Sequence, residues 1–368
     1  MKNTFGQNLT VTLYGESHGR AIGAVIDGIA PGIPVDEEYI THWLNLRKPH
    51  GAISTARQEA DEFSIDSGVF NGYTTGTPVA IRIENRSQIS KDYSYLATAA
   101  RPGHADYAAY CKYHGYADYR GGGHFSGRVT AAFCAAGAIV LSALKAKRIR
   151  IGTHIKRLGK VCDSAFGNYA EDIERLEQRV FPVLNTAIEE EMQAEILAAK
   201  ERLDSVGGIL ETVILGMPGG VGEPYFDSLE SLLAHAMFSI GGVKGVEFGD
   251  GFAMADRLGS EANDAFRVKD GEVVTVTNHN GGINGGISNG MPILFRCAVK
   301  PTPSIAQKQQ TVDFVSKKNK ELEIHGRHDP AIVHRARAVV DCLTALTVAD
   351  ALVGRFGTDW LAPKEEER

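Results

Sequence analysis

Cysteine is scarce in this 368-residue sequence, and its spacing excludes the usual cysteine-based sites. The cysteines are odd in number, lie far apart and form no CxxC pair: they are Cys111, Cys134, Cys162, Cys297 and Cys342. This pattern indicates neither a disulfide framework nor a zinc site. We expect them to be small side chains buried in a reducing compartment.

Apolar targeting and membrane segments are also missing. Met1–Asn8 has no basic stretch followed by an apolar run, which a signal peptide would need. The longest nearly apolar stretch, Ala131–Leu144, is shorter than the roughly 20 residues that cross a bilayer. We therefore expect a cytoplasmic protein without a membrane partner, in which this stretch forms a buried helix.

A surplus of basic charge and the common nucleotide motifs are absent as well. The chain carries 39 Lys and Arg residues against 45 Asp and Glu, a net charge of −6, which argues against a nucleic-acid surface. No GxGxxG motif opens a strand–turn–helix unit and no Walker A sequence occurs, so neither a Rossmann site nor a P-loop is supported. The histidines lack the close spacing of metal ligands, and no metal is expected.

Glycine, by contrast, is abundant. The 41 glycines exceed the average share of about 7% and lie between apolar segments, so many tight turns or close approaches of backbone to ligand are expected. The hydrophobic periodicity predicts a mixed α+β order, with Asp36 as a helix cap and Pro182 as a helix break. Strands are expected at 9–14, 21–26, 78–83, 149–157 and 209–215, and helices at 37–46, 105–116, 129–147 and within 172–205.

The chain shows no linker rich in proline, serine or charge. We therefore expect one domain over 1–362 and a disordered tail at 363–368. One spacing pattern occurs twice, in Gly72, Gly76, Pro78 and Arg82 and again in Gly286, Gly290, Pro292 and Arg296. The segment 28–32 also loosely resembles 216–219. A duplicated α+β unit explains both matches, and chance matching in a glycine-rich chain is the alternative.

The strongest candidate site is Tyr119–Arg128, with the sequence YRGGGHFSGR, which runs directly into the helix expected from 129. Its glycines let backbone N–H groups converge on an anion, and the start of the helix adds unpaired donors and a positive dipole end. Arg120 and Arg128 would supply guanidinium groups and Ser126 a hydroxyl. The segment therefore predicts a phosphate-binding loop.

Two further loops offer candidate acid–base groups. His18 lies in GESHG directly after an expected strand, and suits a general acid or base there, although a lone histidine is more often an ordinary surface or core residue. In RPGHAD, a Pro-Gly turn would present Arg101 and His104 together. An ordinary turn before a helix is the alternative.

Several segments in the second half have the composition of ligand loops. Asp329 in GRHDP is either a catalytic group or the N-cap of the helix that carries Arg335 and Arg337, and capping is the usual role of such a residue. The loop Lys300–Ser304 places a cation and two hydroxyls on a stiff backbone that suits phosphate. The glycine-rich segment 280–290 allows close approach to a flat ligand, and 241–249 is either a ligand loop or a tight connection.

Seven of these segments resemble the chorismate synthase family in order and spacing, from residue 6 to about 345: GESHG, RPGHAD, YRGGG…SGR, VKGVEFGDGF, NGGINGGISNG, KPTPS and GRHDP. The resemblance implies a carbon–oxygen lyase of the shikimate pathway, in aromatic amino acid biosynthesis. It would convert 5-enolpyruvylshikimate 3-phosphate to chorismate and phosphate by 1,4-anti elimination. The resemblance also implies reduced FMN without net redox change, a homotetramer, and a duplicated β-α-β sandwich with helices between antiparallel sheets.

The same resemblance assigns roles to single residues. His18 would assist departure of the phosphate, His104 would manage the proton on the reduced flavin, and Asp329 would act with the flavin in removing the hydrogen. The substrate's phosphate and carboxylates would be held by Arg47, Arg101, Arg128 and Arg327. Contacts to FMN would come from His124, Phe125, Ser126, Gly241, Gly242, Gly285, Lys300, Pro301, Thr302, Pro303, Ser304 and Arg327.

The required chemistry agrees with these residue types. Departing phosphate is an anion that arginines and an acid can stabilise. The allylic C–H bond is barely acidic, so base catalysis alone would be slow and a reduced flavin is a suitable source of electron density. The chain departs from the family pattern at His124, where many members have Arg, and at Ile53, where many have a second arginine that Arg57 could replace. A third change, to Gly127 from Ala, is expected to be harmless.

Two other functions compete with this interpretation. A flavoprotein oxidoreductase would share the anion loops but would need a nicotinamide site, and none is visible in the sequence. A non-catalytic binding protein would leave His18, His104 and Asp329 without a purpose. The source of reduced flavin is also open between NADPH used by the protein itself and an external reductase. The absence of an evident reductase segment favours the external source.

Overall fold

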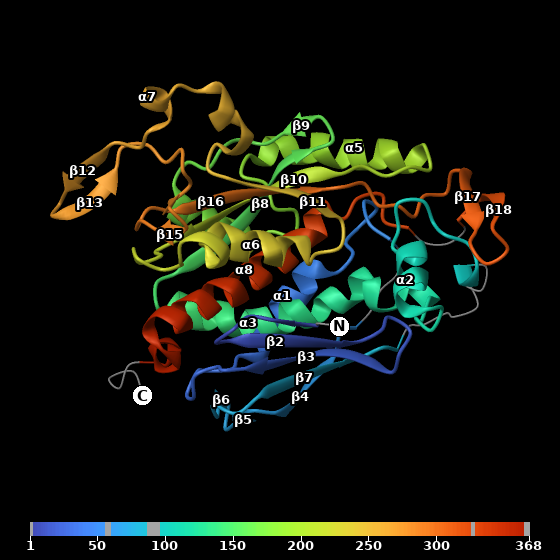
Figure 1. Cartoon of the computed structure of the whole chain (residues 1–368), viewed down its shortest axis with the longest axis horizontal. Coiled ribbons are helices and arrows are strands. Elements are labelled where there is room, and N and C mark those ends of the chain that lie inside the picture. The colour runs from blue at the N-terminus through green and yellow to red at the C-terminus, as the bar shows by residue number, and fades with distance from the viewer. Residues whose placement is uncertain (1–2, 56–59, 87–95, 325–327, 364–368) are drawn as a thin grey trace.

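The computed structural model describes residues 3–55, 60–86, 96–324 and 328–363. Two five-stranded antiparallel sheets enclose a layer of helices, and further helices cover the outer side of the second sheet (Figure 1). The α+β class and the sandwich of helices between antiparallel sheets, both predicted, are thus confirmed.

The first sheet has one face toward the helices and one toward solvent. Its alternation is clear in the strand 79–84, where Val79, Ile81 and Ile83 are buried and Arg82 and Glu84 are exposed. Such alternation is typical of an antiparallel sheet with one solvated face. In order across the sheet, the strands are β1 (Thr4–Phe5), β2 (Thr10–Gly15), β3 (Ala21–Asp27), β7 (Val79–Glu84) and β4 (Phe63–Ser67).

The second sheet has helices on both faces around β8 (Arg150–Leu158) and β10 (Gly208–Leu215). Its strands, in order, are β9 (Val161–Cys162), β8, β10, β16 (Ile293–Val299) and β11 (Val243–Phe248). In β10, five consecutive residues from Leu210 are buried, as expected for a strand between two layers. The outer layer consists of α4 (Tyr169–Glu177) and α5 (Glu189–Glu201) (Figure 1).

The two sheets repeat one topology, as the spacing pattern in the sequence predicts. The order β2-β3-β7-β4 matches β8-β10-β16-β11, and in each half one helix follows the second strand and another follows the last. These helices are α1 (Glu37–Arg47) and α3 (Thr130–Ala146) in the first half, and α6 (Leu229–Phe238) and α8 (Val333–Phe356) in the second. The matched glycine patterns precede β7 and β16 and follow β3 and β10, so they lie at equivalent positions.

The central helices pack closely. A Cβ atom at Gly137 of α3 would lie 2.3 Å from the Cβ of Cys342 of α8, so glycine is required where the two helices approach. The segment Gly127–Ala146 is the one helical span in the described ranges that could cross a membrane by length and composition, yet it is 78% buried. Its apolar character is therefore explained by core packing, and the predicted buried helix is confirmed.

Most predicted elements are present. Asp36 caps α1 by accepting from the backbone N–H groups of Glu38 at 2.9 Å and Tyr39 at 3.0 Å. The expected helical region 172–205 is divided around Pro182 into α4 and α5, and the expected helix 105–116 is α2 (Asp106–Tyr113). Several elements were not among those predicted. They are α6, β4, β11 and β16, and the short elements β1, β5 (Val69–Phe70), β6 (Tyr73–Thr74), β9, α7 (Gly259–Ala262), β12 (Phe266–Lys269), β13 (Glu272–Thr275), β14 (Ile283–Asn284), β15 (Ile287–Ser288), β17 (Gln309–Asp313) and β18 (Lys318–Leu322). The domain limits 1–362 stay a prediction, and the predicted tail lies, after Pro363, outside the described residues.

Candidate active site

A cavity of about 950 Å³ lies where the two halves of the fold meet. The first half contributes the end of α1 and the segment before α3, and the second half contributes the end of α6, the loop after β16 and the start of α8. Predicted site residues on its wall are His18, Arg47, Arg101, His104, His124, Phe125, Ser126, Arg128, Gly241, Gly242, Lys300, Pro301, Thr302, Pro303, Ser304 and Asp329. Residues far apart in the sequence therefore share one cavity.

Three expected ligand contacts are not found on this wall. Gly285 lies in the turn between β14 and β15, away from the cavity lining. Arg120 instead donates from Nε and Nη2, both at 2.8 Å, to Asp118. Arg327, like Arg57, lies outside the described residues. Contacts of Gly285 and Arg327 with a ligand therefore stay predictions, whereas the expected contact of Arg120 with phosphate is not supported.

The cavity is strongly basic although the chain is acidic overall. Among the described residues of its wall, the only carboxylate belongs to Asp329. Against it stand seven cationic side chains: Arg47, Lys48, Arg101, Arg128, Lys244, Lys300 and Arg335. Such a concentration of one sign of charge in a cleft attracts anionic ligands.

His104 is held in one tautomer by a carboxylate behind it. Its Nδ1 lies 2.7 Å from Oδ1 of Asp106, and hydrogen bonds from Arg101 and His104 outweigh burial and keep the pKa of Asp106 well below its usual range. Nη2 of Arg101 also lies 3.1 Å from Nδ1, but ionised Asp106 is closer and can only accept, so Nδ1 carries the hydrogen and Nε2 is left for other partners. A Cβ at Gly122 would lie 3.5 Å from that Nε2.

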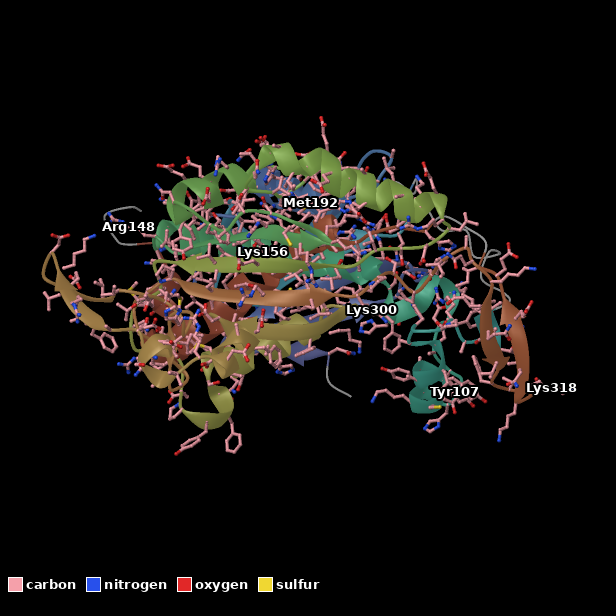
Figure 2. The ribbon with its side chains drawn as sticks, turned by 90° about the horizontal axis from the view of Figure 1, so that it is seen from above. Tyr107, Arg148, Lys156, Met192, Lys300 and Lys318 are labelled. Carbon is pink, nitrogen blue, oxygen red and sulfur yellow. The ribbon has the colours of Figure 1, made fainter. Side chains whose placement is uncertain are left out.

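Asp106 also fixes Arg101, so one carboxylate positions two predicted site residues. Arg101 donates from Nε and from Nη2, each at 2.8 Å, to the two oxygens of Asp106. A further bond from Nη1 reaches Oγ of Ser304 at 3.3 Å. The RPGHAD turn and the loop after β16 are thereby joined, and Figure 2 shows Lys300 of that loop between the body of the second sheet and the end carrying α2. Lys300 donates from Nζ to the Gly103 carbonyl.

The buried His18 lies directly against the glycine-rich loop. Gly121 has φ +59°, and a Cβ there would lie 2.2 Å from Cε1 of His18, so only glycine fits. Ser17 contacts Nδ1 of His18 at 3.1 Å and donates from its backbone N–H to Gly123 at 3.1 Å. Gly121, one of the glycines that suggested a phosphate cradle, is therefore also required to seat His18.

Two other residues of this loop, His124 and Ser126, make hydrogen bonds that hold the local structure. His124 donates from Nδ1 to the carbonyl of Gly15, the last residue of β2, at 2.7 Å. Ser126 caps the short helix Gly127–Val129 by accepting from the backbone N–H of Arg128 at 3.3 Å. His124 thus ties the loop to the first sheet, which an arginine at this position would do differently. Ile53, the other departure from the family pattern, is buried and does not line the cavity.

Asp329 is oriented by two donors. Its Oδ1 accepts from the backbone N–H of Thr55 at 2.9 Å, and its Oδ2 accepts from Nη1 of Arg335 on the first turn of α8. The N-cap of α8 is Ile332, without a side-chain cap, so the alternative of Asp329 as helix cap is wrong. Next to it, burial lowers the pKa of His328, which is therefore neutral near pH 7.

A third carboxylate, that of Asp61, bridges Arg47 and Arg128 of the cavity wall. Oδ2 of Asp61 accepts from Nη2 of Arg47 at 2.9 Å, and Oδ1 accepts from Nη1 of Arg128. Burial raises the pKa of Asp61, but the two guanidinium groups outweigh it and hold the pKa below its ordinary value. Sequence reasoning missed Asp61, Asp106 and Arg335; only Asp106, inside RPGHAD, had a signal in its motif.

Part of the cavity wall is apolar. It includes Phe5, Phe133 and Phe238, together with Val11 and Leu13 of β2. The cavity therefore offers both cations and apolar side chains, some of them aromatic. This combination suits an aromatic ring system beside a multiply charged anion.

Comparison with known proteins points to one family. The chorismate synthase family model matches residues 9–353. The chorismate synthase of Pyrococcus abyssi is 48% identical over 350 residues, which cover 95% of this chain and 97% of that protein. The chorismate synthase of Lachnoclostridium phytofermentans is 46% identical, with 95% of each chain covered. A crystal structure of chorismate synthase superposes with a TM-score of 0.75 at 30% identity, covering 96% of this chain and 94% of that one.

Proposed function

The chain belongs to the chorismate synthase family, and from this premise we propose that the basic cavity is where 5-enolpyruvylshikimate 3-phosphate becomes chorismate and phosphate. The protein is thus a carbon–oxygen lyase of the shikimate pathway. The observation that carries the assignment of the cavity is its surplus of cations around two seated histidines and one carboxylate. The substrate has a phosphate and two carboxylates, which match that charge.

The arginines hold the substrate and stabilise the leaving phosphate. Arg47 and Arg128 come from different elements and meet at one carboxylate, and Arg101 donates to Ser304 of the loop after β16. As the C–O bond breaks, negative charge grows on the phosphate, and fixed guanidinium groups lower the energy of that state. His18, seated on Gly121, donates a proton to the departing oxygen.

His104 and Asp329 are the groups that bind or release a proton elsewhere in the site. Asp106 keeps the hydrogen of His104 on Nδ1, so Nε2 is the atom that holds or releases a proton on the cavity side. Asp329 is kept in place by Thr55 and Arg335 and accepts a proton from the ligand side. The two groups come from opposite halves of the fold.

The family uses flavin, and the described residues fit reduced FMN. The cavity is larger than one sugar-sized ligand needs, its aromatic and aliphatic lining suits a flat ring, and Lys300–Ser304 offers a cation and hydroxyls for a phosphate. The residues expected to hold FMN on the wall are His124, Phe125, Ser126, Gly241, Gly242, Lys300, Pro301, Thr302, Pro303 and Ser304. When bound, reduced FMN would supply electron density to the substrate and would act together with Asp329 in the removal of its single departing hydrogen.

Anaerobic turnover tests this function. Purified protein, reduced FMN and 5-enolpyruvylshikimate 3-phosphate are mixed, and chorismate, phosphate and the flavin spectrum are followed together. We expect many equivalents of both products per flavin, with the flavin reduced at the end. Stoichiometric flavin oxidation would support the oxidoreductase alternative, and no product would support the binding protein. Turnover in air with NADPH, FMN and no reductase would show that the protein reduces its own flavin.

We further propose a cytoplasmic homotetramer. The side of the molecule with β12 and β13 exposes large apolar side chains, among them Phe252 at 84% and Val268 at 76%. Monomeric proteins rarely expose such side chains together, and self-association is their common use. Light scattering should give four times the mass of the chain, and a monomer at micromolar concentration would contradict the proposal.

A further inference from the structure

Asp61 lies behind the cavity wall, where it contacts two arginines that line the cavity. Its carboxylate is fully buried and bridges Nη2 of Arg47, at the end of α1, to Nη1 of Arg128, just before α3. Both arginines line the cavity, whereas Asp61 does not. The carboxylate therefore contacts the groups proposed to bind substrate without facing the substrate itself.

The backbone at Asp61 is unusual as well. Its φ is +54°, in the left-handed region that non-glycine residues rarely adopt and that Asp and Asn tolerate best. Strained backbone of this kind persists where the surroundings fix it, and it is common near functional sites. Here it directs the carboxylate between two arginines that are 81 residues apart in the sequence.

Arg128 is fixed on further sides. Its Nε donates to Oδ1 of Asn85 at 3.0 Å, and its Nη2 donates to the backbone carbonyl of Glu84 at 3.2 Å. The plane of the guanidinium is thus set by three partners, and Arg47 is set relative to that plane through Asp61. A clamp ordered before the ligand arrives binds with a smaller loss of conformational entropy.

We propose that Asp61 is the positioning residue that presents Arg47 and Arg128 as one preformed clamp for the substrate's phosphate. This inference rests on the proposed role of the two arginines in the active site. The charge of Asp61 and its proposed positioning role predict opposite effects of its removal on phosphate binding. Asp61 is an anion near an anion site, so Coulomb repulsion alone would make its removal strengthen phosphate binding. Positioning predicts that its removal weakens binding.

Calorimetric titration of the full-length protein with inorganic phosphate tests the two predictions. Asp61→Asn keeps the side-chain shape and tolerates the left-handed backbone, while Asp61→Glu keeps the charge and moves it by one methylene. Asp66→Asn is the matched control: it makes the same charge change in an exposed pair with Arg82 at 3.2 Å. Melting temperature and near-UV circular dichroism confirm folding, because a buried ion pair that loses a partner destabilises a protein.

We expect both Asp61 variants to bind phosphate at least about tenfold more weakly than the wild type, and Asp66→Asn to bind as the wild type does. Asp61→Asn binding equally or more tightly would overturn the proposal. Should Asp61→Asn not fold, wild-type affinity in Asp61→Glu would overturn it equally. Absence of phosphate binding by the wild type would overturn the clamp itself. If the wild type makes no chorismate but the phosphate results hold, the proposed function fails and this inference stands.

Discussion

Carboxylates behind the cavity set the positions of its cationic side chains. Asp106 holds Arg101 and His104, and Asp61 holds Arg47 and Arg128. In each case an ionised carboxylate accepts charge-assisted hydrogen bonds, which are roughly twice as strong as neutral ones. The groups proposed to touch the substrate are therefore ordered before it binds.

The first prediction concerns the two proton-handling residues. His104→Asn and Asp329→Asn remove a titrating group while keeping most of the side-chain volume, and each should lower kcat by about 10²–10⁴ without loss of fold. His114→Asn is the control, because His114 is exposed, lies off the cavity and has a left-handed φ that Asn accepts. Steady-state anaerobic kinetics measure the effect. Wild-type rates in His104→Asn or Asp329→Asn would contradict the assigned roles.

At this scale the sequence predicted the residues that stand in motifs. His18, His104 and Asp329 were found because glycine or proline beside them marks a turn, although His18 itself is buried. The role of Asp61 could not be predicted from the sequence, because it depends on a contact with Arg128, which is 67 residues away. Asp329 was ambiguous because a side chain before a proline caps a helix or faces a site, and only the position of Thr55 and Arg335 decides.

Among the elements, the loop 120–125 is the one that assembles the site. Ser17 and His124 tie it to the end of β2 through the backbone of Gly123 and Gly15. Its three consecutive glycines all have positive φ, and Gly123 would meet the Asp118 carbonyl at 1.9 Å if it carried a Cβ. The loop conformation therefore depends on these glycines, and Gly121 leaves the space that His18 occupies.

The second prediction tests this loop. Gly121→Ala would place a Cβ 2.2 Å from His18 at φ +59°, and we expect a loss of about 1–3 kcal/mol in the free energy of unfolding with a marked drop in kcat. Gly127→Ala is the matched control, because its φ is ordinary and no atom lies within 4 Å of the added Cβ. Urea unfolding and turnover measure both variants. Equal behaviour of the two would contradict the proposed seating of His18.

Regular elements were predictable where burial imposes a period. Strands such as β3 and β7 alternate or run apolar because one face must be buried, and α1 begins at a polar cap. The hairpin β12–β13 could not be predicted, since both its strands are largely exposed and show no core-facing alternation. The proposed homotetramer would explain why the valines of this hairpin are exposed in the single chain.

At the scale of the whole molecule, duplication explains the place of the cavity. Each half supplies equivalent strands and helices, and the loops that join them differ between the halves. Histidines 18 and 104 come from the first half, and Asp329 and Lys300 from the second. The site therefore forms only when both halves are folded together.

The third prediction concerns the pH dependence of stability. Burial, followed by the charge of Arg335, lowers the pKa of His334 from its ordinary value of 6.5 to about 3. In the unfolded chain this histidine is protonated below about pH 6.5, whereas in the folded chain it stays neutral down to about pH 3. Between these values the unfolded chain binds more protons, so this group lowers the free energy of unfolding as the pH falls. Within that window the slope is at most about 1.4 kcal/mol per pH unit.

His334→Gln removes this contribution and should flatten the loss of stability between pH 6.5 and 4. The buried Asp341 acts in the opposite direction, because burial raises its pKa to about 6, but it is present in both proteins and cancels in the comparison. Urea unfolding at several pH values gives the two slopes. Identical slopes would contradict a neutral, buried His334.

The central claim is that one cavity between the halves binds both substrate and flavin. A crystal structure of the protein grown anaerobically with FMN and 5-enolpyruvylshikimate 3-phosphate tests it most directly. We expect both ligands inside the cavity, with the substrate phosphate on Arg47 and Arg128 and the flavin along Lys300–Ser304. Electron density for the substrate elsewhere on the protein, with this cavity filled only by solvent, would contradict it.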